Sequence, residues 1–460
     1  MPEQFEDQGG VSTMDPSPFR RAAGSFLMRR WSDPRRLAAR RRRIERARRR
    51  SGERHVVEYF HQVDDGYSHL AAQCLRPLLD TYDIDLVCHV VGDPSGQNAP
   101  EPELLLDLSC YDSAQIGPHY GLSFPDDARR PDAGPVDLAG RILAGLDPED
   151  FVDVAPLVGE GLWSGSDEAL QALAERHPPA EPSTLAQRRQ TGTDRRTELG
   201  HYSGAMFTYG GEWYWGVDRL YHLEERLTEL GVRRAPGDLI APRPAIVNGP
   251  RKDDGSLTLE IYPSLRSPYS SLIFDTAVDL ARETGVTMSM RPVLPMVMRG
   301  VPATREKGLY IFTDAAREAR HLGLDDWGNV HDPIGEPVRR GYSLYPWAVS
   351  RGKGVELLSA FFRAAFWEGV NTGKDRGLRR VVERAGLPWD EARGIVGNPD
   401  WEEELEANRV AMYGFGLWGV PSFRLLDGAG ETLLAVWGQD RLWLVGREIQ
   451  RHLEEREKGL

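Results

Sequence analysis

The fold is decided by Leu257-Thr-Leu-Glu-Ile-Tyr262 and by the run that follows it closely, Ser267-Pro268-Tyr269-Ser270-Ser271-Leu272. The first run predicts a β-strand, and the second opens an amphipathic stretch that predicts a helix beginning near Ser267. The same pair of runs occurs 202 residues earlier, as His55-Val-Val-Glu-Tyr-Phe60 and Asp65-Gly66-Tyr67-Ser68-His69-Leu70. The chain therefore contains a strand–helix unit twice.

A second set of matching blocks lies near the end of each copy. Gly200-His-Tyr-Ser-Gly-Ala205-Met-Phe207 matches Gly416-Leu-Trp-Gly-Val-Pro421-Ser-Phe423 at an offset of 216 residues. Trp215-Gly-Val-Asp218-Arg219-Leu220 matches Trp437-Gly-Gln-Asp440-Arg441-Leu442 at an offset of 222. Several anchors in one order indicate an internal repeat, with extra residues in the middle of the second copy.

Each copy predicts the element order βαβ, a helical middle, then ββα. That order is the order of a thioredoxin fold with a helical insertion, so we expect an α/β protein with two thioredoxin-like domains in tandem. The predicted boundaries are a basic arm at 1–54, a first domain at 55–233 and a second at 257–460. Between the domains, residues 234–256 are rich in Pro and Gly, which is typical of a linker.

The second copy resembles a known family in three blocks. These are Ser267-Pro268-Tyr269-Ser270, then Lys307-x-x-Tyr310-x-x-x-Asp314-x-x-Arg317, then Tyr413-Gly-x-Gly416-x-x-Gly419-Val420-Pro421 with Trp437-Gly438-Gln439-Asp440-Arg441-Leu442. Over about residues 257–455 it resembles the DsbA-like thioredoxin family, on the branch of 2-hydroxychromene-2-carboxylate isomerases and kappa-class glutathione transferases.

The resemblance implies a site for glutathione. Ser267 would donate a hydrogen bond to the glutathione thiolate, at a helix N-terminus whose N–H groups favour the thiolate over the thiol. The backbone of Val420, before a cis Pro421, would pair with the backbone of glutathione. Asp440, with Gln439 beside it, would face the γ-glutamyl ammonium group.

Basic residues supply the remaining candidates. Lys307, which is Leu105 in the first copy, is a candidate for binding a ligand carboxylate, and Arg299 is another. The pairs His331-Asp332 and Arg339-Arg340 fall in the helical insertion, where the family's second substrate sits, and they are weaker candidates.

Ordinary structural roles remain open for the same residues. Ser267 also suits a helix N-cap, Asp440 the N-cap of the last helix, and Lys307 a solvated surface position. The sequence also departs from the family, because residues 295–302 hold no Asn and Gln439 replaces the usual Ser or Asn.

The first copy lacks the residues for this chemistry. It has Asp65 where the second copy has Ser267, and a carboxylate raises the pKa of a neighbouring thiol. It has Ala205 in place of Pro421, which disfavours a cis peptide. We expect it to be a partner domain, completing an intramolecular pseudo-dimer, and homo-oligomers stay open.

Composition limits the remaining functions. Only three cysteines occur, Cys74, Cys88 and Cys110, and no CxxC pair, so neither a dithiol redox motif nor a metal site is expected. The net charge is −13, yet 15 arginines stand against three acids between Arg20 and Arg54. This arm is expected to be solvated and partly helical, to bind an anionic membrane surface or a polyanion, or to dock on the acidic body.

Two functions fit these patterns. One is a glutathione-dependent isomerase, transferase or reductase that acts on a small electrophilic molecule. The other is a non-catalytic tandem scaffold that binds partners through its basic arm. With few cysteines and no apolar run of membrane-spanning length, a cytoplasmic location is expected.

Overall fold

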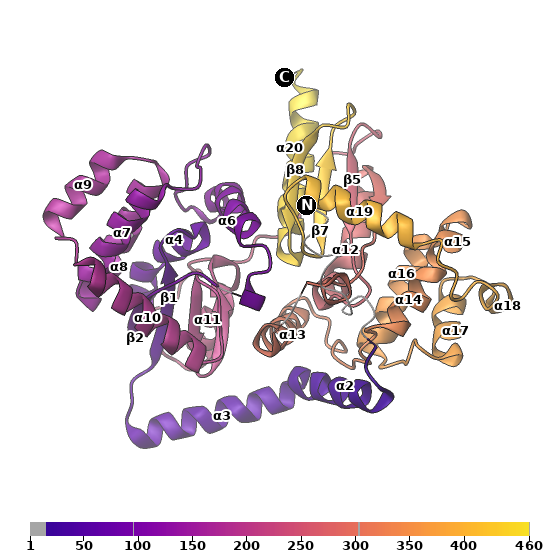
Figure 1. The fold of residues 1–460 in the computed structure, drawn as a ribbon, viewed down its shortest axis with the longest axis horizontal. Coiled ribbons are helices and arrows are strands. Elements are labelled where there is room, and N and C mark those ends of the chain that lie inside the picture. Colours follow the sequence, from indigo (N-terminus) through magenta and orange to yellow (C-terminus); the bar gives the residue numbers. More distant parts are fainter. Residues whose placement is uncertain (1–14, 95, 302–303, 460) are drawn as a thin grey trace. The chain divides into compact units, whose positions relative to one another are not determined.

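The computed structural model describes residues 15–94, 96–301 and 304–459, so the first 14 residues of the predicted basic arm lie outside it. The chain divides into two compact units. The β1 unit consists of residues 39–244 and 304–307. The β5 unit consists of the remaining residues, 1–38, 245–303 and 308–460. Each unit is named after its first strand (Figure 1).

The β1 unit is built on a four-stranded sheet in the order β2-β1-β3-β4. Its strands are β1 (Val56–Gln62), β2 (Asp85–Val91), β3 (Met206–Tyr209) and β4 (Glu212–Trp215). β1 pairs parallel with β2 and antiparallel with β3, and β3 pairs antiparallel with β4. Four of the seven residues of β1, including Phe60, are buried as a continuous run at its C-terminal end, as expected for a central strand covered on both faces.

The β5 unit has a sheet of the same order and the same strand directions, β6-β5-β7-β8. Its strands are β5 (Thr258–Tyr262), β6 (Thr287–Met290), β7 (Ser422–Leu426) and β8 (Thr432–Trp437). The predicted order βαβ, helical middle and ββα is therefore confirmed for this unit.

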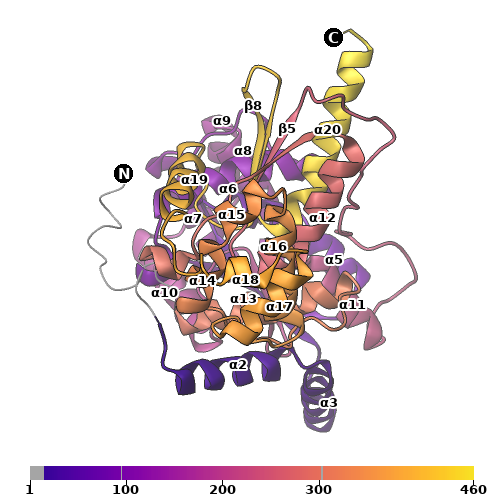
Figure 2. The same cartoon turned by 90° about the vertical axis from the view of Figure 1, so that its right-hand side faces the viewer.

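Helices occupy the middle and the end of each unit. In the β1 unit they are α4 (Gly66–Ala72), α5 (Leu75–Thr81), α6 (Pro102–Ile116), α7 (Ala133–Gly145), α8 (Pro148–Trp163), α9 (Asp167–Arg176), α10 (Pro182–Glu198) and α11 (Leu220–Glu229). In the β5 unit they are α12 (Pro268–Thr284), α13 (Arg305–His321), α14 (Glu336–Ser343), α15 (Tyr345–Ser350), α16 (Gly354–Phe362), α17 (Asp375–Arg384), α18 (Trp389–Ala392), α19 (Glu402–Gly414) and α20 (Leu442–Glu457). Both views show α12 beside α20, the two helices that contact each other next to the sheet (Figure 2).

Corresponding side chains make corresponding hydrogen bonds in the two units. The hydroxyl of Tyr67 donates to Asp112 at 2.9 Å, and the hydroxyl of Tyr269 donates to Asp314 at the same distance. The hydroxyl oxygen of Ser68 accepts the backbone N–H of Gln62 at 3.2 Å. Another such bond joins Ser270 to the N–H of Ser264, also at 3.2 Å. These tyrosine and serine side chains therefore hold α4 and α12 in place in their respective units.

No residue of the predicted linker, 234–256, belongs to a helix or a strand. Both ends of this segment are nevertheless fixed. The carboxylate of Glu224 accepts the backbone N–H groups of Ile240 and Ala241, and the side chain of Gln450 exchanges two hydrogen bonds with the backbone of Arg251.

The basic arm forms two helices, α2 (Pro18–Ser32) and α3 (Pro34–Ser51). α2 docks on the β5 unit, where Ser25 is 1% exposed and its hydroxyl oxygen accepts the backbone N–H of Asp332 at 3.0 Å. α3 docks on the β1 unit, where Arg41 makes a two-pronged ion pair with Glu212 at 2.7 Å. The prediction of a solvated arm is thus wrong for one face of each helix, and docking on the body is confirmed. No helix in the described part of the chain is long and apolar enough to cross a membrane.

Candidate functional site

The candidate site begins at the N-terminus of α12. Ser267 occupies the N-cap position, and its hydroxyl oxygen accepts the backbone N–H of Ser270 at 3.0 Å. The same hydroxyl donates to the carbonyl oxygen of Val420 at 3.2 Å. Ser267 is half-buried. The expected capping role of Ser267 is confirmed, and the hydroxyl also reaches the second predicted segment of the site.

That second segment is the turn before β7. The Val420–Pro421 peptide is cis, as expected, and the carbonyl oxygen of Pro421 accepts the backbone N–H of Gly438 at 2.9 Å. A Cβ added at Gly419 would lie 2.0 Å from the indole ring of Trp437, so only glycine fits at this position. The turn is thus held by its own packing, with Val420 placed beside the helix N-terminus.

A buried ion pair lies next to Ser267. The guanidinium group of Arg266 holds the carboxylate of Asp332 through two hydrogen bonds, at 2.8 and 3.0 Å. Burial alone raises the pKa of Asp332, but the charge and hydrogen bonds of Arg266 outweigh it and hold this pKa below its usual range. Arg266 was not predicted from the sequence, although a basic residue directly before the Ser-Pro pair was a visible signal.

The helix α2 contacts the backbone around Asp332. Arg21 donates to the carbonyl oxygen of Asp332 at 3.1 Å and to that of Ile334, and the hydroxyl of Ser25 lies 3.2 Å from Nδ1 of His331. A continuous set of contacts therefore runs from α2 through residues 331–334 to Arg266 and the N-cap of α12.

The weaker candidates in the helical insertion have structural partners. His331 contacts α2, and burial lowers its pKa. Arg339 pairs with Glu336 at 3.4 Å, and Arg340 donates to Asp375 at 2.5 Å. Their side chains are engaged in holding the insertion together.

Arg299 lies close to the turn that carries Val420. Its Nε donates to the carbonyl oxygen of Leu294 and its Nη2 to that of Trp418, both at 3.0 Å. Burial lowers the pKa of Arg299. In this structure Arg299 positions the turn two residues before Val420.

Lys307 lies in the first turn of α13 (Arg305–His321), and residues 304–307 group with the β1 unit. Its Nζ lies 3.4 Å from the carbonyl oxygen of Asn98 and 5.9 Å from the ring centre of Tyr202. Burial lowers the pKa of Lys307 to about 8. The prediction of a solvated surface lysine is therefore wrong for this side chain.

Gln439 and Asp440 lie in a single 3₁₀ turn, Gln439–Arg441, directly before α20. The side-chain amide of Gln439 donates to Glu318 at 2.7 Å, inside the unit. Asp440 is 8% exposed and lies 3.8 Å from the guanidinium group of Arg441. The N-cap position of α20 is Arg441, one residue after Asp440, because the chain takes an extra tight turn before the helix begins. A capping role of the Asp440 side chain stays a prediction.

The β1 unit has a different residue at the position of Ser267. Asp65 caps α4, and its carboxylate accepts the backbone N–H of Ser68 at 3.1 Å and the hydroxyl of Ser68 at 2.7 Å. Burial raises the pKa of Asp65 to about 6, and the neighbouring Asp64 adds to the effect. Ala205, at the position of Pro421, has φ = 54°, and the cis bonds of the described chain lie elsewhere.

All three cysteines belong to the β1 unit. Burial raises the pKa of the Cys74 thiol to about 12 and also raises the pKa values of Cys88 and Cys110. A thiol reacts as its thiolate, so these cysteines are poor nucleophiles.

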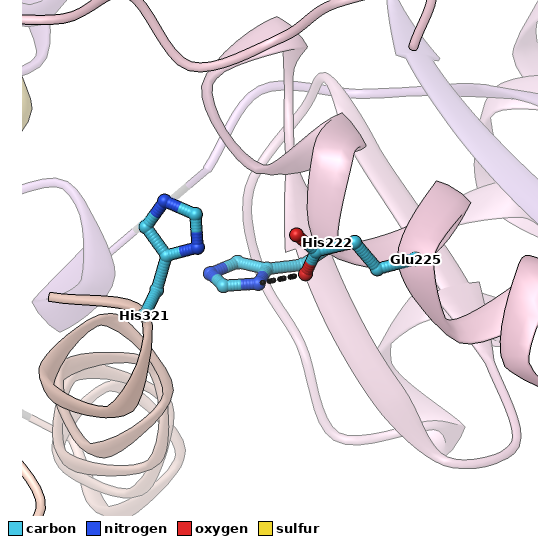
Figure 3. Close-up of side chains that lie close together, drawn as sticks. All are labelled: His222, Glu225 and His321. Carbon is cyan, nitrogen blue, oxygen red and sulfur yellow. Dashed lines mark ion pairs between the residues drawn. The ribbon is translucent and has the colours of Figure 1, made fainter. Parts of the chain in front are cut away.

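Another polar pair of the β1 unit lies on α11. Nδ1 of His222 lies 3.4 Å from the carboxylate of Glu225, one helical turn further on (Figure 3). The spacing is that of an ordinary ion pair along a helix surface.

Residues 258–450 match the family model of the DsbA-like thioredoxin domain. This segment is a DsbA-like thioredoxin domain. The match covers the β5 unit from its first strand to most of α20, and it includes Ser267, Arg299, Val420 and Pro421.

A curated relative of the DsbA-like domain is 2-hydroxychromene-2-carboxylate isomerase of Sphingobium xenophagum. It is 27% identical over 195 residues, which are 40% of this chain and 94% of the relative. Among solved structures, a 2-hydroxychromene-2-carboxylate isomerase has 16% identity and a TM-score of 0.36, and the match covers 44% of this chain and 99% of that protein. The cytosolic disulfide reductase DsbM from Pseudomonas aeruginosa has 19% identity and a TM-score of 0.33, and the match covers 43% of this chain and 99% of that protein.

Proposed function

We propose that the DsbA-like domain of this protein is an enzyme that binds glutathione and uses its thiolate on a small electrophilic substrate, as an isomerase or a transferase. The observation that carries the proposal is the hydroxyl of Ser267, which caps α12 and meets the carbonyl of Val420. This unit holds no cysteine in its sequence, so a reactive thiol has to come from a second molecule.

The N-terminus of α12 fits a thiolate for two physical reasons. First, the N–H groups of the first turn and the helix dipole give this point a positive potential. Second, the hydrogen of the Ser267 hydroxyl can rotate about the Cβ–Oγ bond while Oγ continues to accept the N–H of Ser270. Ser267 can therefore turn its donor from Val420 to a thiolate without loss of the cap.

A bound thiol supplies, as its thiolate, a nucleophile that adds to an electrophilic carbon of the substrate and then either leaves after rearrangement or stays attached as the product of a transfer. Ser267 stabilises the negative charge on sulfur, and the ion pair of Arg266 with Asp332 holds the residue directly before it in place. Arg299 keeps the Trp418–Pro421 turn in position, so that the backbone of Val420 is fixed for pairing with a peptide ligand.

The candidate residues for the γ-glutamyl group and the carboxylates of glutathione fit less well than those for its thiolate. Gln439 uses its amide group on Glu318, so it is a poor candidate for the γ-glutamyl group, and Asp440 remains the candidate there. Arg299 and Lys307 both lie in the matched segment, and both remain candidate cations for a carboxylate. The name of the curated relative indicates a small cyclic carboxylate as its substrate, and we propose the same class here.

We also propose that the β1 unit is a second copy of the same fold without the chemistry. The shared strand order and the paired hydrogen bonds of Tyr67 with Asp112 and Tyr269 with Asp314 support this. Its buried Asp65 would repel a thiolate. A role as the second half of an intramolecular pseudo-dimer stays a prediction.

The test is isothermal titration calorimetry of the full chain with glutathione and with S-methylglutathione. We expect the wild type to bind glutathione, and Ser267→Ala to bind it at least tenfold more weakly while S-methylglutathione, which has no thiolate, is affected less. Asp65→Ala, the matched cap of the β1 unit, should leave the affinity unchanged. No heat of binding at millimolar glutathione would contradict the proposal and favour a non-catalytic role.

A further inference from the structure

The helix α2 presents an apolar face that its docking on the β5 unit does not use. Phe19, Phe26 and Leu27 are 82%, 57% and 42% exposed. Their spacing of seven and eight residues places them on one face of the helix. The opposite face contains Ser25 and Met28, which pack against the β5 unit.

Exposed apolar side chains of this size on one helix face indicate an interaction surface. Single exposed hydrophobic residues are common, but here two phenylalanines and a leucine are exposed on one face of a 15-residue helix. Arg20 and Arg30 lie on the same exposed side of α2.

The helix α3, which follows after the single residue Asp33, presents the matching charges. Arg35, Arg42, Arg43 and Arg46 are exposed, and their spacing places them on one side of α3. In the described part of the chain no carboxylate pairs with these four side chains.

The arginines on the docked side of α3 behave differently. Arg41 pairs with Glu212 at 2.7 Å and Arg48 with Glu45 at 2.8 Å. Arg41 therefore helps to hold α3 on the β1 unit, whereas Arg48 pairs within the helix. The four exposed arginines make no such ion pair in the described part of the chain.

We propose that α2 and α3 together bind the protein to an anionic lipid surface. In this arrangement Phe19, Phe26 and Leu27 enter the boundary between headgroups and acyl chains, and the exposed arginines of α3 bind the lipid phosphates. Aromatic and aliphatic side chains next to arginine are the composition that binds this boundary. Nucleic acid would account for the arginines but not for the apolar patch.

The experiment is co-sedimentation of the full-length protein with vesicles at physiological ionic strength. One set of vesicles contains equal parts of phosphatidylglycerol and phosphatidylcholine, and the other contains phosphatidylcholine alone. We expect binding to the first set that is at least tenfold stronger than to the second and that weakens as salt is added.

Two variants separate the contributions. Phe19→Ser, Phe26→Ser and Leu27→Ser in one protein should weaken binding to anionic vesicles at least tenfold. Replacement of Arg35, Arg42, Arg43 and Arg46 by serine should do the same and should reduce the salt dependence. Because all seven side chains are exposed, the melting temperature should change little.

Matched controls remove as many exposed residues elsewhere. Leu157→Ser with Val349→Ser and Val410→Ser is the apolar control, and serine at Arg129, Arg188, Arg376 and Arg393 is the charge control. Both should bind vesicles as the wild type does. Vesicle binding that both arm variants retain would overturn the proposal.

Two other occupants give distinct outcomes. Binding to a 30-nucleotide DNA that the arginine variant loses and the apolar variant keeps, without vesicle binding, would identify a nucleic-acid surface and overturn the proposal. A dimer in analytical ultracentrifugation that the apolar variant dissociates, again without vesicle binding, would identify an interface between copies and overturn it equally.

Discussion

Ser267 and Asp65 occupy the same place in their respective units and make the same cap, but their charges differ. Both side chains accept the N–H of the residue three positions later, Ser270 or Ser68. A hydroxyl can do this and still donate a hydrogen bond, whereas a carboxylate can only accept. One substitution at a helix N-cap therefore separates a site that can stabilise a thiolate from one that cannot.

The first prediction concerns Asp65→Asn. Asn also caps helices well, so the replacement keeps the hydrogen bond and removes the buried charge. The pKa of Asp65 is raised to about 6 in the folded chain, above its value when unfolded, so the folded state binds the proton more tightly. The wild type therefore loses stability as the pH rises from about 4 through 6.

Asp65→Asn should accordingly stabilise the β1 unit by about 1–3 kcal/mol at pH 8 and by much less at pH 4.5. Thermal unfolding of both proteins at the two pH values measures this. Asp147→Asn, an exposed residue before α8, is the control and should have no such pH-dependent effect. Equal stability of wild type and Asp65→Asn at pH 8 would show that the carboxylate is not destabilised by burial.

Single residues were partly predictable. The cap at Ser267 and the cis bond at Pro421 followed from local patterns, because both depend on a few adjacent residues. Arg266 and Asp332 are separated by 66 residues and meet only through the packing of the insertion. No spacing in the sequence indicates such a pair, so the role of Arg266 beside the cap was not predicted.

At the scale of elements, α2 is the part of the fold that the sequence described least well. Its arginines suggested a solvated helix, but Arg21 donates to two backbone carbonyls and Ser25 is buried. An arginine has a long apolar stem and five N–H groups, so composition alone does not separate an exposed arginine from a docked one.

The second prediction tests the ion pair between the insertion and the cap. Asp332→Asn leaves the partly buried Arg266 without its counter-charge and should cost about 2–4 kcal/mol of stability at pH 7. The pKa of Asp332 in the folded chain is below its unfolded value, so the stabilisation is present above pH 4 and is lost as the pH falls through the folded pKa.

The measurement is denaturant unfolding of both proteins between pH 3 and pH 7. The control is Asp375→Asn, which removes the partner of Arg340. Because the side chain of Asp375 is 59% exposed, this change should cost less than about 1 kcal/mol. If Asp332→Asn lowers the free energy of unfolding no more than the control does, the ion pair does not contribute to the stability of the insertion.

At the scale of the whole molecule, the two units share a strand order. They differ in content, because the three cysteines lie in the β1 unit and Ser267 lies in the β5 unit. The element order was predictable because apolar periodicity and the repeated blocks report it directly. The surroundings of Lys307 were not predictable, because a family motif does not reveal that this side chain lies against Asn98 and Tyr202.

The third prediction follows from the location of the cysteines. A variant with alanine at Cys74, Cys88 and Cys110 should melt at a lower temperature, since at least two of the thiols are buried, each removal costing about 1 kcal/mol. Its affinity for glutathione should stay within twofold of the wild type, because the proposed nucleophile is not part of the chain. Loss of binding in calorimetry, in a variant that is still folded, would place a protein thiol in the reaction.

The central claim is that the N-terminus of α12 stabilises an external thiolate. The most direct measurement is the pKa of the glutathione thiol in the complex, from the thiolate absorbance near 240 nm as the pH is raised. In the wild type this pKa should fall by at least one unit from its ordinary value of about 8.5. In Ser267→Asp, which keeps the cap and adds a negative charge, it should return to that value or rise above it. An unshifted thiol pKa in the wild-type complex, or the same lowered pKa in Ser267→Asp, would contradict the claim.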